Sequence, residues 1–203
     1  MGTLKVDNIQ TESGSAIITN GAIPESTLRS SGVGMVKLFS STSSSGVANF
    51  DIDSTYINST YDNYRMYLGY QTASDNVIAL VDFFVGGTEV TANYSYENAA
   101  LTSSTYAYDA VGAGKMFLGS TQGNATSETG TVVLDLTNVN STDVATRIHG
   151  FQSYNATNAN AVGRVFQGGQ DVNSYTSVVN GIKFYISSGN IIVKNFALYG
   201  VVK

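Results

Sequence analysis

The sequence predicts an all-β fold, an antiparallel β-sandwich of the jelly-roll type that follows a short N-terminal β anchor arm. Three observations predict this fold class. The 203 residues include 13 Tyr and nine Phe, and aromatic residues favour strands. About eight to ten short apolar stretches follow one another, joined by Gly, Asn and Ser turns at a spacing typical of sandwiches. Helical periodicity is absent, except for room for a turn or two in residues 53–62.

The N-terminal segment, residues 1–33, differs from the rest and is predicted to be an anchoring and oligomerisation arm. It alternates like a strand and then turns at Ser13-Gly14. The predicted anchoring residues are Leu4, Val6 and Ile9. It lacks the continuous apolar core of a secretory leader, so we expect it to remain in the mature protein. Fewer than about 40 residues rarely form a core alone, so the arm is expected to pair with copies of itself or with another protein.

Residues 34–203 are predicted to form the head domain, as a succession of short strands. In chain order, we expect strands within residues 35–40, 46–52, 63–71, 76–87, 130–137, 144–154, 161–169, 179–187 and 191–203. Ser188-Gly189-Asn190 is typical of the loop of a closing hairpin. Residues 86–130 contain the longest irregular stretch and therefore the expected functional loops.

Alternation assigns the faces of these strands. Tyr64, Met66, Leu68 and Tyr70 share one face of their strand, opposite residues such as Arg65 and Tyr67. Val132, Leu134 and Leu136 likewise share a face, opposite Asp135 and Thr137. Residues 77–85 are apolar on both faces, so we expect a second layer to cover the outer one. This coverage is our reason to predict a homotrimer.

Composition excludes several classes of function. Only 12% of the residues are charged and the net charge is −5, whereas nucleic acid and anionic membranes need a basic face. No stretch approaches the ~18 apolar residues of a membrane-spanning helix, so no membrane insertion is expected. The chain has no Cys and one His, which disfavours a zinc site. We therefore expect no cofactor, no metal and no catalytic residues.

Three polar sites are the candidates for chemistry. His149 lies on a predicted strand, on the same face as Phe151 and opposite Ile148, and is interpreted as a surface or half-buried residue. Asp51 and Asp53 are interpreted as caps of the turn that follows them, with a calcium site as the alternative. Asp82 interrupts an apolar strand and is expected to be hydrogen-bonded, at a subunit contact or at a sheet edge. None of these positions suggests an enzyme.

Tyrosine residues in the long irregular stretch are the glycan-binding candidates. They are Tyr94, Tyr96, Tyr106 and Tyr108. A Tyr ring presents a flat apolar face together with a hydroxyl, which suits sugar rings. The alternative is that these rings fill the core or a subunit interface.

Two ends of the chain resemble a known class of protein. The opening "TLKVDNIQTESGSAIITNGA" is similar to the leading element of virion structural proteins and tail fibres of tailed marine bacteriophages, including those of cyanobacteria. The closing "VNGIKFYISSGNIIVKNFALYGVVK" resembles the closing hairpin of C-terminal jelly-roll domains in phage fibre proteins. The block "FDIDSTYINSTYDNYRMYLGYQTAS" resembles the early strands of the same domain. The long central repeats of the family are absent here.

The resemblance implies a non-enzymatic virion protein of the short tail fibre type, assembled in the cytoplasm of a bacterial host. Its arm would anchor a homotrimer to another virion protein of the tail or capsid, and its heads would attach to a host cell-surface glycan. Three heads on one stalk multiply weak affinities. The alternatives are a capsid decoration or vertex fibre protein, a glycan-depolymerising tailspike, and a cellular carbohydrate-binding module. A tailspike needs two carboxylates in a cleft, and the sequence offers no obvious pair.

Overall fold

The computed structural model describes residues 8–10, 16–19, 34–101, 109–157, 160–171 and 177–202. The chain divides into two compact units. The first holds residues 1–36 together with Val202, and the second, here called the head, holds residues 37–201.

The first unit contains an antiparallel strand pair, β1 (Asn8–Gln10) and β2 (Ala16–Thr19). Ile9 lies opposite Ile18, and a bulge follows at Gln10. Residues 8–10 therefore have a partner strand in their own chain, which corrects the expectation that this opening strand pairs only with another copy or with another protein. The predicted turn at Ser13-Gly14 lies outside the described residues. Leu4 and Val6 lie outside the described residues.

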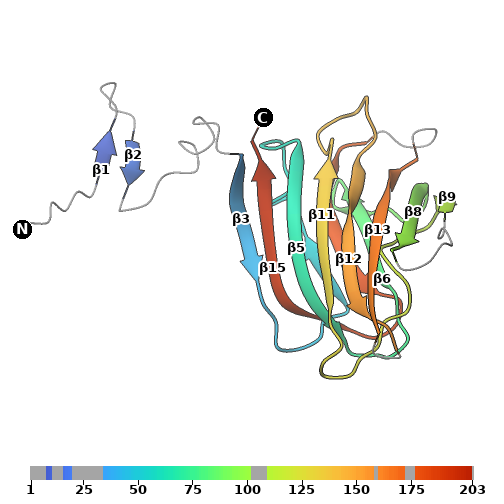
Figure 1. The fold of residues 1–203 in the computed structure, drawn as a ribbon. Coiled ribbons are helices and arrows are strands. Elements are labelled where there is room, and N and C mark those ends of the chain that lie inside the picture. Colours follow the sequence, from blue (N-terminus) through green and yellow to red (C-terminus); the bar gives the residue numbers. More distant parts are fainter. Residues whose placement is uncertain are drawn as a thin grey trace, which may run out of the picture. The chain divides into compact units, whose positions relative to one another are not determined.

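The head is a sandwich of two antiparallel sheets, as predicted (Figure 1). One sheet has eight strands in the order β3-β15-β5-β11-β12-β13-β8-β9. Its strands are β3 (Met35–Ser41), β15 (Ile191–Val201), β5 (Asn63–Thr72), β11 (Gly130–Thr137), β12 (Arg147–Asn155), β13 (Ala161–Gln170), β8 (Tyr94–Ala100) and β9 (Asp109–Ala113). The described residues contain no helix.

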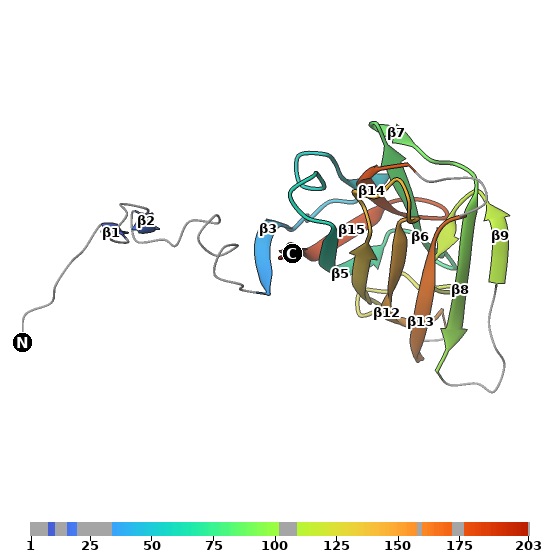
Figure 2. The same ribbon diagram turned by 90° about the horizontal axis from the view of Figure 1, so that it is seen from above.

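The second sheet has five strands in the order β10-β6-β14-β4, with β7 paired to β6. Its strands are β10 (Met116–Phe117), β6 (Ala79–Val85), β14 (Val179–Ile186), β4 (Asn49–Ile52) and β7 (Thr88–Glu89). Figure 2 shows β6 and β14 in a layer behind β5, β12 and β13. The core fills the space between the two layers.

The predicted alternation sets which side chains enter the core. Tyr64, Met66, Leu68 and Tyr70 of β5 are all buried, at most 1% exposed. Val132, Leu134 and Leu136 of β11 are buried in the same way. Their strand neighbours point to the opposite face of the eight-stranded sheet. That opposite face is therefore built from residues that alternation leaves outside the core.

The turn at Ser188-Gly189-Asn190 is not the loop of a hairpin, which corrects the sequence prediction. It joins β14 of the five-stranded sheet to β15 of the eight-stranded sheet. Gly189 has a φ of 84°, and a Cβ there would lie 2.1 Å from the hydroxyl oxygen of Ser74. Glycine fits this crossover because it avoids both the left-handed strain and the steric clash.

Residues 86–130 contain more regular structure than predicted. Strands β7, β8, β9 and β10 all lie within this range. Residues 94–100, which the sequence suggests are part of an irregular stretch, form a strand of the eight-stranded sheet. Local pattern missed this strand because Asn98 stands where the apolar alternation of Tyr94 and Tyr96 would continue.

Candidate ligand-binding face

The predicted glycan-binding tyrosines that the structure describes belong to the core. Tyr94 is 0% exposed, and its hydroxyl accepts from the backbone N–H of Phe83 (2.7 Å) and donates to the carbonyl of Val90 (3.0 Å). Tyr96 is 5% exposed and packs against Phe117, with ring centroids 5.4 Å apart. Neither ring is available to a surface ligand, so both are withdrawn as glycan-binding candidates. Tyr106 and Tyr108 lie outside the described residues and stay predictions.

A different surface gathers exposed aromatic and charged side chains, namely the face of the eight-stranded sheet turned away from the core. Strand register places six side chains directly beside one another across this face. This polar row consists of Tyr199, Arg65, Asp135, His149, Gln167 and Glu97, from β15, β5, β11, β12, β13 and β8. Residues opposite one another in paired strands share a face and lie within contact range.

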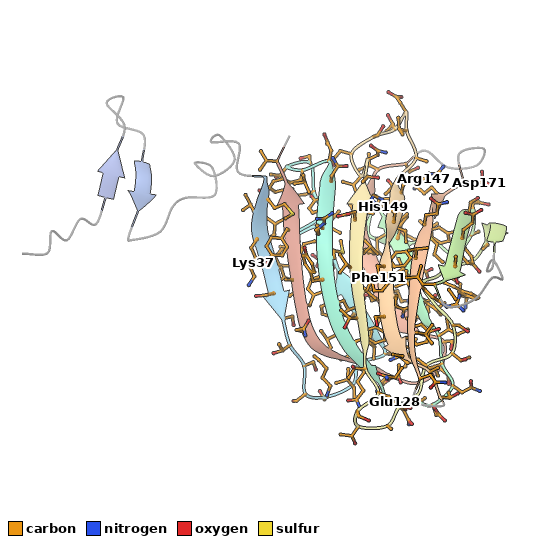
Figure 3. The ribbon with its side chains drawn as sticks, in the orientation of Figure 1. Lys37, Glu128, Arg147, His149, Phe151 and Asp171 are labelled. Atoms are coloured by element: carbon orange, nitrogen blue, oxygen red, sulfur yellow. The ribbon has the colours of Figure 1, made fainter. Side chains whose placement is uncertain are left out.

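A second, apolar row runs beside the polar row and is displaced from it by two residues on every strand. It consists of Ala197, Tyr67, Val133, Phe151, Val165 and Ala99. Tyr67 and Phe151 are each 38% exposed and Val165 is 44% exposed. The polar row and the apolar row together form what we call the front face. Figure 3 shows His149 and Phe151 following one another along β12.

An ion pair fixes the centre of the polar row. Arg65 donates from Nε to Oδ1 of Asp135 and from Nη2 to Oδ2, both at 2.6 Å. The hydrogen bond to Asp135 raises the pKa of Arg65 above its ordinary value. His149 Nε2 lies 3.6 Å from the same carboxylate, on the other side of it. Two-pronged arginine–carboxylate pairs are geometrically specific, so the pair holds both side chains in a defined orientation.

The two ends of the front face are also ordered by side-chain contacts. Tyr67 and Tyr199 meet edge to face, with centroids 5.9 Å apart and an interplanar angle of 87°. At the other end, Gln167 Nε2 donates to Glu97 Oε2 at 2.9 Å. Rigid strands carry all of these groups. Preorganised side chains lose little freedom when a ligand binds.

The arrangement of the front face suits a ligand with one apolar side and one hydroxyl-bearing edge. Tyr67 and Phe151 supply exposed ring surface for stacking against apolar C–H groups. Asp135 and Glu97 can accept hydrogen bonds from hydroxyls, whereas His149 and Gln167 bring nitrogen donors. A sugar ring has both of these features.

The acidic residues named from the sequence serve the fold. Asp53 Oδ1 accepts from the N–H of Thr55 at 2.9 Å, so Asp53 caps the turn as predicted. Asp51 lies opposite Lys183 in the pairing of β4 with β14, and burial raises its pKa. Among the described residues, no three His, Cys, Asp or Glu side chains gather closely enough to hold a metal ion.

Asp82 lies inside the five-stranded sheet rather than at its edge, since β6 pairs with β10 on one side and β14 on the other. It is 2% exposed, its Oδ2 accepts from the Tyr185 hydroxyl at 2.7 Å, and its Oδ1 has no partner. Burial raises the pKa of Asp82 to about 7, and the neighbouring Glu89 adds to this rise. The Glu89 carboxylate itself pairs with Lys183 Nζ at 2.8 Å. A residue this deeply buried is not placed to contact a macromolecular ligand.

Sequence reasoning missed most of the front face. It placed Arg65 and Tyr67 on the face of their strand that leaves the core, placed Asp135 likewise, and paired His149 with Phe151. These are correct intrastrand assignments. It lacked the register between strands that are far apart in the sequence, such as the pairing that places Arg65 opposite Tyr199, 134 residues later in the chain. The sequence did contain one signal that could have located this face. An aromatic residue follows two positions after a charged or polar residue, on the outward face of the same strand.

Within the described part of the chain, no helix has the length and hydropathy that crossing a membrane needs.

No protein-family model and no curated protein matches the sequence. Among solved structures, the head is similar to the galectin LEC-6 of Caenorhabditis elegans, with 12% identity, a TM-score of 0.34, and coverage of 78% of this chain and 94% of the galectin. A Shewanella oneidensis protein of unknown function, SO2946, is 11% identical with a TM-score of 0.33, and the match covers 83% of this chain and 75% of that one. The PL-14 alginate lyase of Aplysia kurodai is 13% identical with a TM-score of 0.25, over 82% of each chain. Likenesses this distant concern fold alone.

Proposed function

We propose that this chain is a non-enzymatic structural protein of a bacteriophage virion, of the short tail fibre type, whose head attaches to a host cell-surface glycan through the front face. The resemblance of both chain ends to phage fibre proteins supports the virion assignment. The N-terminal arm would dock on another virion protein, of the tail or the capsid. The virion is accordingly the proposed location.

The observation that carries the binding role is the adjacency of the two rows on the front face. An exposed apolar row containing Tyr67 and Phe151 runs directly beside a row of charged and amide side chains. A surface for another protein chain tends to place charges at a rim around an apolar centre. Parallel stripes of stacking surface and hydrogen-bonding groups fit an extended saccharide better.

Removal of the two exposed rings tests this role. Each ring contributes roughly 1 kcal/mol of stacking, so the pair Tyr67→Ala with Phe151→Ala should weaken binding of host-surface polysaccharide about tenfold or more. Phage that carry both substitutions should adsorb to the host correspondingly more weakly. Val144→Ala is the matched control, because Val144 is also an exposed apolar side chain (54%) but lies in the loop between β11 and β12.

Thermal unfolding separates a lost ligand contact from lost structure. The melting temperatures of the double variant and of Val144→Ala should both stay within a few degrees of the parent, because the removed side chains are substantially exposed. Unchanged polysaccharide binding and unchanged adsorption of the double variant would rule out the front face as the attachment site. That result would favour a capsid decoration protein.

A further inference from the structure

Within the polar row, as far as the structure describes it, the only guanidinium is already occupied. Arg65 directs two nitrogens at the two oxygens of Asp135. This fork is the geometry with which arginine would otherwise hold a carboxylate of a ligand. Its charge is therefore balanced inside the chain, and an acidic sugar that took the same two-pronged hold on Arg65 would have to displace Asp135.

The charged side chains around the polar row do not supply a free cation in place of Arg65. Glu97 is exposed at the far end of the row and carries a second negative charge. Arg147 lies two residues before His149 on β12, beyond the row, where its guanidinium donates to the backbone carbonyl of Gln170. The chain as a whole has a net charge of −5. Approach of a polyanionic glycan is therefore opposed by the field of the protein.

We infer that the front face selects uncharged glycans over glycans that contain uronate or sialate, and that Asp135 sets this specificity by neutralising Arg65. The inference rests on the proposed glycan-binding function. In an uncharged glycan, ring C–H groups lie on the Tyr67 and Phe151 side, and hydroxyls donate to Asp135 without disturbing its pair with Arg65. Specificity of this kind arises because the disfavoured ligand finds no free charged group with which to pair.

A pair of charge-matched variants tests the inference. Asp135→Asn and Glu97→Gln each remove one negative charge from the polar row, but only Asp135→Asn releases Arg65. The full-length parent and both variants are applied to an array of neutral oligosaccharides and their uronate- or sialate-bearing counterparts, at about 50 mM and about 500 mM NaCl. Melting temperatures within a few degrees of the parent establish that each variant is folded.

The parent should bind members of the neutral set, with affinities that change less than about twofold between the two salt concentrations. Asp135→Asn should gain at least about tenfold in binding to uronate probes at low salt, and lose that gain at high salt because it depends on an exposed charge. Glu97→Gln should gain much less. Stronger binding of the parent to acidic than to neutral counterparts, or equal gains by both variants, would overturn the inference. Binding of no glycan by the parent would instead overturn the proposed function on which it rests.

Discussion

Among the described residues, Asp82 is the one whose surroundings depart most from those of an ordinary carboxyl group. It sits in the middle of β6, between strands that pair on both sides, and one of its oxygens has no hydrogen-bond partner. Burial raises its pKa to about 7. An ordinary aspartate in an unfolded chain titrates near pH 4, so folding favours the protonated form of Asp82.

This raised pKa predicts the pH dependence of stability. The contribution of Asp82 is fully present below about pH 4, falls as the pH rises towards 7, and stays low above that. The parent should therefore melt at a lower temperature at pH 8 than at pH 5. Asp82→Asn retains an oxygen that can accept from Tyr185 but no longer titrates, so its melting temperature should change less between these pH values.

Asp143→Asn provides the control for a substitution of an exposed acid, because Asp143 lies in a surface loop between β11 and β12. Its melting temperatures at pH 5 and pH 8 should follow those of the parent. Equal melting temperatures of the parent at the two pH values would contradict the raised pKa of Asp82.

At the scale of the elements, alternation within strands was predictable and pairing between strands was not. The faces of β5 and β11 follow directly from their sequences, because side chains alternate with a period of two. Which strand lies beside which depends on contacts between distant residues. For this reason the turn at Ser188-Gly189-Asn190 suggested a hairpin, whereas it is a crossover between the two sheets. The polar row was hidden for the same reason, since six strands build it.

Tyr94 shows how an element changes the role of a residue. The sequence around it suggests a loop with exposed rings, and the structure forms β8 there, which turns the rings of Tyr94 and Tyr96 into the core. Asp53 shows the opposite case. Its capping of the next turn depends on residues two positions away, so the local sequence was sufficient to predict it.

At the scale of the whole molecule, coverage of β6 removes one reason to expect a trimer. Leu80 and Asp82 on its outer face are as well buried within the chain as Val81 and Phe83 on its inner face. No second copy is needed to cover them. The homotrimer therefore remains a prediction that rests on the resemblance to phage fibre proteins.

Deletion of residues 2–30 tests the two-unit organisation and the trimer together. The deletion removes no strand of the head, so the truncated protein should keep the β-rich circular dichroism spectrum of the parent. Light scattering at micromolar concentration should give the mass of three chains for the parent. An unfolded truncated protein would contradict the two-unit organisation, and a monomeric or dimeric parent would contradict the fibre-type trimer.

Attachment of a host glycan to the front face is tested most directly by mapping backbone amide chemical shifts of the full-length protein during titration with host-surface polysaccharide. The largest shifts should fall on the adjoining segments 65–67, 133–135 and 149–151, which form the centre of the two rows. Shifts concentrated elsewhere, or none at a polysaccharide concentration that saturates adsorption, would contradict a glycan-binding front face.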